Sequence, residues 1–240
     1  MFVVIALILL CAGASFVQRV CGFGFGVFIM TMLPYLCPSY NEATTLSGIL
    51  SACQSLYVLF VLWRLVSLRR ILLIMCSCIV FSYIAIQYVA VASDSFLQVL
   101  LGIVLILLSL FFLFISPKIQ VRPTKTLQVS MGALSGVMGG LFGMHGPPAV
   151  IYFLATEKDK NTYMAICQAY FFLTNVVMTI FRAQKGFVTP FVGWSCLYAC
   201  VGIVIGSYFG RKVFDKIPAE KLRKVIYIYM IFSGIVAICA

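Results

Sequence analysis

Acidic side chains are scarce in this sequence. Six of the 240 residues are Asp or Glu, 17 are Lys or Arg, and charged residues of both signs make up 10% of the chain. A soluble domain carries roughly 25% charged residues, so this chain has too few polar side chains to cover a surface that faces water. No hydrophilic stretch is long enough for a separate soluble domain. We therefore predict a single membrane domain over residues 1–240.

The few acids are also absent from the middle of the apolar runs. All six lie at the ends of predicted helices: Glu42, Asp94, Glu157, Asp159, Asp215 and Glu220. A carboxylate that relays protons or holds sodium in a membrane protein must lie at membrane depth. The sequence therefore disfavours carboxylate-based coupling. Coupling through His145, coupling through the protonation of a substrate, and no coupling all stay open.

Sequence signatures of enzymes and of metal sites are missing too. There is no P-loop, no His-Glu-x-x-His, no Cys-x-x-Cys, and the single His cannot complete a usual zinc set. The ten cysteines are scattered through apolar runs, where cysteine packs as a small hydrophobe. We predict no catalytic residues, no metal site and no cofactor. A membrane thiol electron carrier is a weaker alternative, and its candidates are Cys76 with Cys78 and Cys196 with Cys200.

What the sequence has in abundance is apolar side chains. They make up 63% of the residues, and the mean hydropathy is +1.13. Several runs reach the roughly 20 residues that a helix needs to cross a bilayer, and a helix satisfies its own backbone in lipid. We predict an all-α polytopic membrane protein. Its segments are Phe2–Val17, Gly24–Leu36, Ala43–Trp63, Ile71–Ala92, Phe96–Ile115, Leu127–Phe142, Pro147–Ala155, Tyr163–Ile180, Val188–Phe209 and Leu222–Ala240.

The ten segments form two similar halves. Repeat 1 covers residues 1–116, a basic linker covers 117–126, and repeat 2 covers 127–240. Each half opens with a stretch broken by glycines, continues with a short apolar arm, and ends with three full-length helices. Gly26 and Gly146 are 120 residues apart, and so are Asn41 and Asn161. This constant spacing predicts an internal repeat.

The Lys and Arg residues predict how the two halves are oriented, because cations gather on the cytoplasmic side. If each glycine-broken stretch crosses once, the halves run parallel and the cations divide eight against eight. If each stretch is a re-entrant hairpin, fourteen cations lie inside and two, Arg182 and Lys185, lie outside. We therefore predict two inverted-topology repeats, each a broken, re-entrant helical hairpin plus three transmembrane helices. Both termini are then outside.

The two glycine breaks carry the predicted site. A helix that starts after such a break presents free N–H groups and the positive end of its dipole, which together bind anions. In transporters built from inverted repeats, such helix starts meet near the midplane of the bilayer. Close helix packing is the alternative role for these glycines. The residues at the two starts are Gly24, Gly26, Gly143, Gly146 and Pro147.

Polar residues inside the apolar runs are few, and each is a candidate for substrate binding. Arg19 could supply a fixed positive charge beside the first break, or extend to the membrane interface. His145 could donate to an anion or sense pH, or hold the backbone of the second break. The uncharged donors are Gln18, Gln54, Gln168, Thr174 and Asn175. For each of these, a hydrogen bond between helices is the alternative.

Two stretches of the chain resemble a known family. Gly132-Ala-Leu-Ser-Gly-Val-Met-Gly-Gly-Leu-Phe-Gly-Met-His-Gly-Pro-Pro-Ala-Val-Ile-Tyr152 is similar to the second-half signature of the sulfite exporter (TauE/SafE) permeases. Gln18-Arg-Val-Cys-Gly-Phe-Gly-Phe-Gly26, followed by Pro34, is similar to the first-half signature. The resemblance covers the whole chain. Many members carry an Arg after the second short arm, where this chain reads Tyr163-Met164-Ala165, so no substrate role for that Arg carries over.

The resemblance implies a multi-pass transporter of the bacterial plasma membrane that exports sulfite, an organosulfonate or a related small oxyanion. Together with the breaks, it predicts that the anion binds near the midplane between the two glycine-broken helices. An anion channel is the main alternative. The expected partners are the small anion and the bilayer, and a homo-oligomer is left open. The net charge of +11 is explained by topology, so no nucleic acid is expected.

Overall fold

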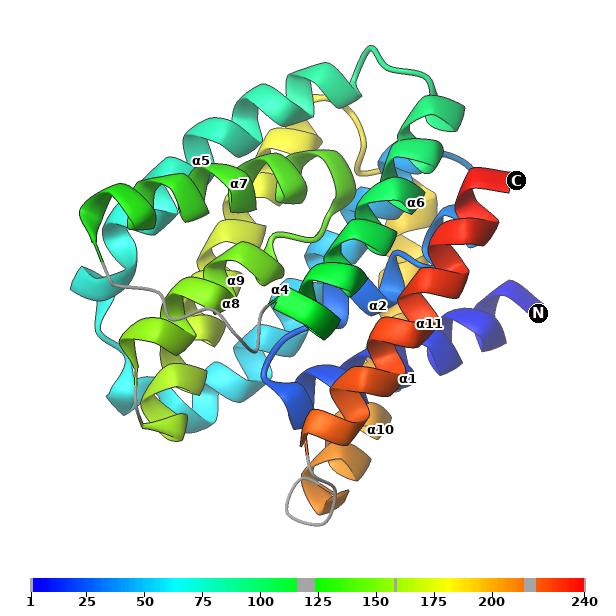
Figure 1. Ribbon diagram of the computed structural model, residues 1–240. Helices are drawn as coiled ribbons and strands as arrows, with labels where there is room; N and C mark the ends of the chain where they lie inside the picture. The colour runs from blue at the N-terminus through cyan, green and yellow to red at the C-terminus, as the bar shows by residue number, and fades with distance from the viewer. Residues whose placement is uncertain (1, 116–123, 158, 214–218, 240) are drawn as a thin grey trace.

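The computed structural model describes residues 2–115, 124–157, 159–213 and 219–239. Within these ranges the chain is mostly helical and contains no strand (Figure 1). Six helices are long and apolar enough to cross a membrane. The structure thus confirms the prediction of an all-α polytopic membrane protein. Part of the predicted linker 117–126 lies outside the described residues.

The first half contains α1 (Phe2–Cys21), α2 (Phe25–Ile29), α3 (Leu33–Leu36), α4 (Tyr40–Leu62), η1 (Trp63–Leu65), α5 (Leu68–Val89), α6 (Asp94–Leu110) and a π-helical turn, η2 (Phe111–Ile115). The second half contains α7 (Lys125–Phe142), α8 (Gly146–Thr156), α9 (Lys160–Gln184), α10 (Pro190–Val213) and α11 (Ala219–Cys239). Several helices start at a side-chain cap. Ser39 accepts a hydrogen bond from the backbone N–H of Glu42 at α4, and Thr124 accepts one from Leu127 at α7.

Two predicted boundaries near the first break are wrong. The first helix does not end at Val17 but continues through Gln18 and Arg19 to Cys21. The predicted arm Gly24–Leu36 is not one element but two short helices, α2 and α3, with a turn between them. Pro34 lies in the first turn of α3, where its missing N–H costs nothing.

Helices of the two halves pair with one another through glycines. Gly202 and Gly206 of α10 pack on the backbone of α1, at the carbonyls of Ile8 and Ala12. Gly132 and Gly136 of α7 pack in the same way on α5. Residue numbers rise together along both pairs, so α1 runs parallel to α10 and α7 runs parallel to α5. Such small-residue faces let membrane helices approach closely.

The remaining long helices pair across the halves in the opposite sense. Gly102 of α6 lies beside Gly234 and Ile238 of α11, and Ile106, one turn later in α6, lies beside Gly234. Residue numbers rise along α6 as they fall along α11, so the two helices are antiparallel. Helices α4 and α9 are antiparallel as well, because Gly48 near the start of α4 lies beside Arg182 near the end of α9, whereas Leu62 at the end of α4 lines a cavity with Lys160 at the start of α9. A two-fold axis in the membrane plane would produce this arrangement. The inverted repeat and its boundaries stay a prediction.

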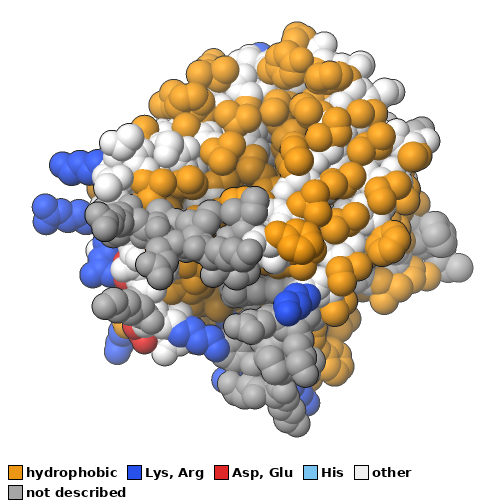
Figure 2. All heavy atoms as spheres, in the orientation of Figure 1, with side chains coloured by type: hydrophobic (Ala, Val, Ile, Leu, Met, Phe, Trp, Pro, Cys, Tyr) orange, Lys and Arg blue, Asp and Glu red, His pale blue; other side chains and the backbone are white. Residues whose placement is uncertain are grey.

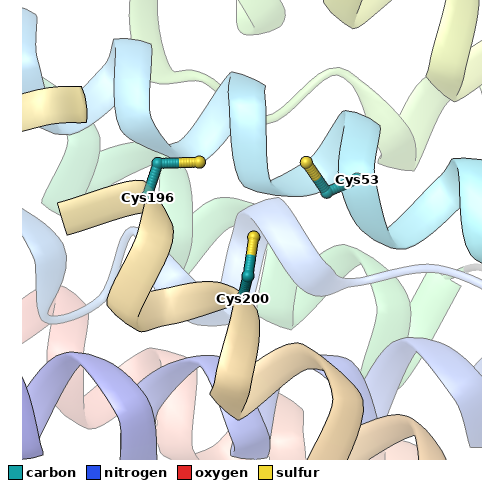
Figure 3. A group of neighbouring side chains, drawn as sticks. All are labelled: Cys53, Cys196 and Cys200. Atoms are coloured by element: carbon teal, nitrogen blue, oxygen red, sulfur yellow. The ribbon is translucent and has the colours of Figure 1, made fainter. Parts of the chain in front are cut away.

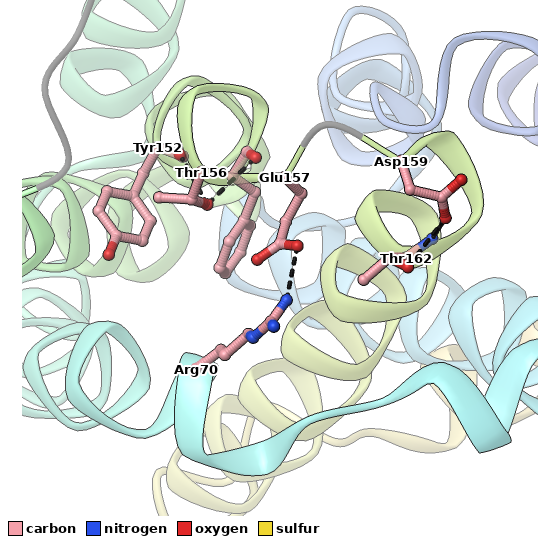
Figure 4. A network of polar contacts seen from close by, with 7 residues as sticks. Arg70, Tyr152, Thr156, Glu157, Asp159 and Thr162 are labelled. Atoms are coloured by element: carbon pink, nitrogen blue, oxygen red, sulfur yellow. Dashed lines mark hydrogen bonds and ion pairs between the residues drawn. The ribbon is translucent and has the colours of Figure 1, made fainter.

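Polar contacts tie the helix ends together at the two ends of the bundle. At one end, Arg70 at the start of α5 forms an ion pair of 2.7 Å with Glu157 at the end of α8 (Figure 4). Asp159 caps α9 there, and hydrogen bonds from the backbone N–H and hydroxyl of Thr162 lower the pKa of its carboxyl group. At the other end, Glu42 accepts a hydrogen bond of 2.5 Å from Thr189.

The surface agrees with a bilayer environment. Large hydrophobic side chains are exposed on α1, α4, α5, α6, α10 and α11. In Figure 2, hydrophobic side chains dominate the upper and right parts of the visible face, and Lys and Arg side chains lie mainly at its left and lower edges. Arg70 is 55% exposed in its ion pair with Glu157, so this pair contributes little to stability.

The charge asymmetry predicts a definite topology. Reporter cysteines or tags at both termini should be accessible from outside the cell, and a reporter in the linker 117–126 from the cytoplasm. The reason is that fourteen cations then lie inside. Membrane-impermeant labelling of intact cells measures this. Termini found on the same side as the linker would instead support the parallel arrangement of the halves.

Candidate functional site

The two glycine breaks meet in the middle of the bundle. In the first break Gly24 has φ 106°, and in the second Gly143 has φ 65°, a left-handed conformation that favours glycine. A Cβ atom on Gly26 would lie 2.9 Å from the carbonyl oxygen of Gly143. The start of α2 therefore touches the end of α7 directly, backbone against backbone.

A small cavity of ≈ 20 Å³ lies where the breaks meet. That is enough for about one water-sized group. Helices α1, α2 and α4 of the first half and α9 and the α7–α8 break of the second half all contribute to its wall. The predicted site residues that line it are Gln18, Gly24, Gly26, Gly143, His145, Gly146 and Asn175. Residues not predicted from the sequence also line it: Phe25, Val27, Ser51, Ser55, Met144 and Phe171.

The two helix starts at the cavity are not equivalent donors. At α2, the backbone N–H of Phe28 donates a hydrogen bond of 2.8 Å to the carbonyl of Gly24, and it is the first N–H group of this helix with a partner inside the helix. The three N–H groups before it therefore have no partner in the helix. At α8, Pro147 and Pro148 occupy the first turn and have no N–H to offer. The two helix starts that the sequence predicted to bind the anion together therefore differ, because α2 offers N–H donors and the first turn of α8 offers few. Helix α2 supplies most N–H groups, but with five residues it has only a small dipole.

Gln168 supports the first break and is not one of the residues that line the cavity. Its amide donates 3.0 Å to the carbonyl of Gly22, where α1 ends. Its oxygen accepts 2.9 Å from the Gln18 amide, which also lies 3.4 Å from the Ser55 hydroxyl. This chain of hydrogen bonds joins α9, α1 and α4. Gln18 is thereby fixed against the wall of the cavity.

His145 is held by both of its neighbouring helices. The Ser135 hydroxyl donates to its backbone carbonyl and accepts 2.8 Å from the Tyr170 hydroxyl. Its ring Nε2 lies 2.9 Å from the Thr174 hydroxyl. The ring is 4% exposed, and its Nδ1 has no hydrogen-bond partner among the described residues.

Asn175 is the other lining residue with an unused polar atom. The side chain is 1% exposed, and its Nδ2 has no hydrogen-bond partner within the described chain. A buried amide donor without a partner costs about 1–3 kcal/mol. Each such group needs an explanation, and a ligand at the cavity is one. Asn175 is therefore a candidate donor to a polar ligand.

Three predicted site residues lie away from the cavity. The oxygen of Gln54 accepts 2.9 Å from Ser207 of α10, so this side chain joins two helices. Pro147 lines two neighbouring apolar pockets. Arg19 lines a separate polar cavity of ≈ 260 Å³ with Lys160 and Arg211. That cavity, which we call the basic vestibule, lies where α1, α4, α9 and α10 have their ends.

The basic vestibule predicts a specific role for Arg19, next to Gln18 of the central cavity. If the chain transports an anion, as its sequence predicts, Arg19→Ala should weaken transport strongly at low substrate concentration, because the vestibule loses one of its three cations. Arg19→Lys should restore part of it, since an ammonium lacks the planar two-pronged donor. Concentration-dependent flux at low and high salt measures the effect. Wild-type flux from folded Arg19→Ala would mean that this side chain only reaches for the interface.

Arg182 is a buried cation that the sequence analysis placed among the outside charges. It is 1% exposed, and its Nη2 donates 2.9 Å to the carbonyl of Gly139 and 3.0 Å to that of Gly140, near the end of α7. Its Nη1 has no hydrogen-bond partner within the described chain, and no acid lies within ion-pair distance there. The missed signal is periodicity, because Asn175, Met178 and Arg182 share one face of α9.

Three cysteine thiols form the one group of possible metal ligands in the described ranges. Cys53 of α4 faces Cys196 and Cys200 of α10, and the three sulfur atoms lie within 4.8 Å of one another (Figure 3). All three are partly buried and none is in a disulfide. Three sulfur ligands suit a soft ion such as Cu(I). The sequence analysis paired Cys196 with Cys200 and Cys76 with Cys78, but it missed Cys53, which is 143 residues away from Cys196.

Comparison with known proteins identifies relatives of the chain. The family profile described as "Sulfite exporter TauE/SafE" matches residues 5–237. A curated relative from Cupriavidus necator, "Probable sulfite/organosulfonate exporter TauE", is 28% identical over 233 residues, which are 94% of this chain and 90% of the relative. No solved structure matches the chain. The described helices and these matches make the protein a multi-pass transporter of the cell membrane, and the chain belongs to the sulfite exporter TauE/SafE family.

Proposed function

We propose that this transporter exports sulfite, an organosulfonate or a related small oxyanion, and that it binds the anion between the two glycine breaks, in the central cavity, once the halves have moved apart enough to widen it beyond the ≈ 20 Å³ of the described state. The sulfite and sulfonate groups share a compact head with three acceptor oxygens. The cavity offers donors for such a head: the amide of Asn175 and the free N–H groups of α2. The name of the Cupriavidus relative supports the same substrate class.

The observation that carries the proposal is the unused Nδ2 of Asn175, one of the residues of the cavity wall. It is a buried donor that the described protein leaves without an acceptor. A structural glycine contact between α2 and α7 would not need it. An anion also needs shielding from lipid, and the cavity lies inside the bundle, walled by α1, α4 and α9.

The arrangement of the halves suggests how the site opens to each side. Both halves contribute to the cavity wall, and the long helices pair across the halves. We propose that the halves are inverted repeats which rock against each other around the bound anion. The basic vestibule would then receive the anion on the side where Lys160 and Arg211 lie.

A flux assay with purified protein in liposomes tests the function. Sulfite, sulfate, thiosulfate, sulfoacetate, isethionate and taurine are offered in turn, with and without a pH gradient. We expect saturable flux with sulfite or a sulfonate and counterflow driven by unlabelled substrate. Flux that does not saturate and shows no counterflow would favour the anion channel. No flux with any of these anions would contradict the proposed substrate class.

The cysteine cluster motivates the other alternative, a thiol electron carrier. A variant in which Cys53, Cys196 and Cys200 are all Ala separates the two functions. The central cavity contains none of these residues, so a transporter should keep its flux. Loss of flux in a folded triple variant, together with thiol oxidation during turnover in the wild type, would support the carrier.

A further inference from the structure

The hydrogen bonds around Thr174 determine which ring nitrogen of His145 carries the proton. The Thr174 oxygen lies 2.7 Å from the carbonyl oxygen of Tyr170 and 2.9 Å from His145 Nε2. Two oxygens this close need a hydrogen between them, and a carbonyl has none to give. The single hydroxyl hydrogen therefore points to Tyr170. His145 Nε2 must then be the donor to Thr174.

A neutral imidazole with its hydrogen on Nε2 has a bare lone pair on Nδ1. That atom is buried and has no donor from the described protein. His145 lines the cavity, and Thr174, which occupies its Nε2, does not. Nδ1 is thus the ring nitrogen without a hydrogen-bond partner, and a ligand can donate to it once the cavity widens to reach it. Nδ1 is an acceptor, whereas Asn175 Nδ2 is a donor.

The surroundings of the ring provide no counter-charge for a second ring proton. From α9 it faces Tyr170 and Phe171, with ring centroids at 5.9 and 5.4 Å, and feels the positive charge of Arg182. From α7 it meets Ser135 and Gly139. The other wall of the cavity, from α1, α2 and α4, carries no titratable side chain, and no lining residue is an acid. Neither Tyr nor Arg changes charge near neutral pH.

The best-matched ligand therefore has acceptor atoms for the Asn175 amide and one hydrogen-bond donor for His145 Nδ1. The cavity also favours a single negative charge, because the cost of burying an ion rises steeply with charge and no cation lines this wall. We infer that the central cavity binds its oxyanion as the singly protonated monoanion, whose own O–H donates to His145 Nδ1. This inference rests on the proposed function. For sulfite, whose second ionisation lies near neutral pH, the bound form is hydrogen sulfite.

Sulfate and sulfonates differ from hydrogen sulfite in a way that matters here. Sulfate is a dianion without a proton at neutral pH, so it should bind poorly. A simple alkyl sulfonate has the right charge but no donor, so Nδ1 would stay unpaired. Isethionate has a hydroxyl group that could supply the missing donor. The lone pair of His145 therefore acts as a filter for monoanions that carry their own hydrogen.

Equilibrium binding of labelled sulfite to the purified wild-type protein, measured on both sides of its second ionisation, tests the inference. We expect the dissociation constant calculated from the concentration of hydrogen sulfite to be the same at every pH. The dissociation constant calculated from total sulfite should rise tenfold per pH unit above the second ionisation. His145→Gln keeps a donor for Thr174 but removes the Nδ1 acceptor. It should weaken hydrogen sulfite binding roughly tenfold, about the value of one buried hydrogen bond, and flatten the preference for the acid form.

Thr174→Val provides the matched variant, because it frees the ring to carry its hydrogen on Nδ1 instead. The preference should then shift toward sulfite dianion and simple sulfonates. Wild-type binding that strengthens as pH rises, or an unchanged pH profile in folded His145→Gln, would overturn the inference while leaving an oxyanion transporter. A wild-type protein that binds no sulfur oxyanion at any pH would instead overturn the proposed function.

Discussion

Gly146→Leu should abolish substrate binding in a protein that still folds. A Cβ atom on Gly146 would meet Phe171 at 3.6 Å, an ordinary contact, so the first carbon of a side chain fits. The rest of a leucine would extend into a cavity of ≈ 20 Å³ and fill it. Gly146→Ala should therefore weaken binding moderately, and leucine should remove it. Binding of labelled sulfite to purified variants with wild-type melting behaviour measures this.

Three other glycines serve as comparisons for Gly146→Leu. Gly193 has nothing within 4 Å of its would-be Cβ, so Gly193→Leu should change neither folding nor binding. A Cβ atom on Gly102 would lie 2.6 Å from the Gly234 carbonyl, so Gly102→Leu should lower the stability of the protein before it lowers substrate affinity. Gly26→Leu should also abolish binding, but its contact with the Gly143 backbone at 2.9 Å makes it a folding risk. Folded Gly146→Leu that keeps its affinity would move the site elsewhere.

Arg182→Met should lower transport more than tenfold while changing stability little. Two opposing terms act on stability. The variant loses charge-assisted hydrogen bonds to Gly139 and Gly140, at about 1.5–3 kcal/mol each, but it also removes a buried cation whose desolvation costs several kcal/mol. These terms nearly cancel. An unpaired buried charge is thus not explained by stability.

The transport effect follows from the charge on Arg182. Asn175 at the cavity and Arg182 are seven residues apart on α9, which is roughly 10 Å along the helix axis. At roughly 10 Å and an effective dielectric constant of about 20, one unit charge stabilises an anion by about 1.7 kcal/mol, or more than tenfold in affinity. Arg182→Lys keeps the charge and should retain most of that affinity.

Lys185 is a matched control for Arg182, because it is a cation at the same end of α9 but exposed. Lys185→Met should leave both flux and melting temperature near the wild-type values. Flux and thermal unfolding measured on the same preparations separate the two roles of Arg182. If Arg182→Met unfolds the protein and Arg182→Lys does not rescue flux, the residue serves mainly to hold the end of α7.

The sequence alone was enough to predict the membrane fold. Its apolar runs and its shortage of charge leave a helical bundle in lipid as the stable arrangement, because only helices satisfy the backbone there. The glycine breaks were also visible, since the left-handed conformations of Gly24 and Gly143 favour glycine. Seven of the predicted site residues line the cavity where these two breaks meet.

Only the tertiary structure decided which polar side chains face that cavity. Gln54 and Gln168 lie on helices that also carry lining residues, yet one bonds to Ser207 of α10 and the other to the break at Gly22. Whether a polar side chain faces the cavity or another helix depends on which helix packs against that face of its own helix. The helices that pack there come from the other half of the chain. The same holds for Arg182, which finds its carbonyl partners 42 and 43 residues away on α7. Hydrophobicity thus determined that the chain enters the membrane, whereas packing between distant helices determined where its few polar groups meet.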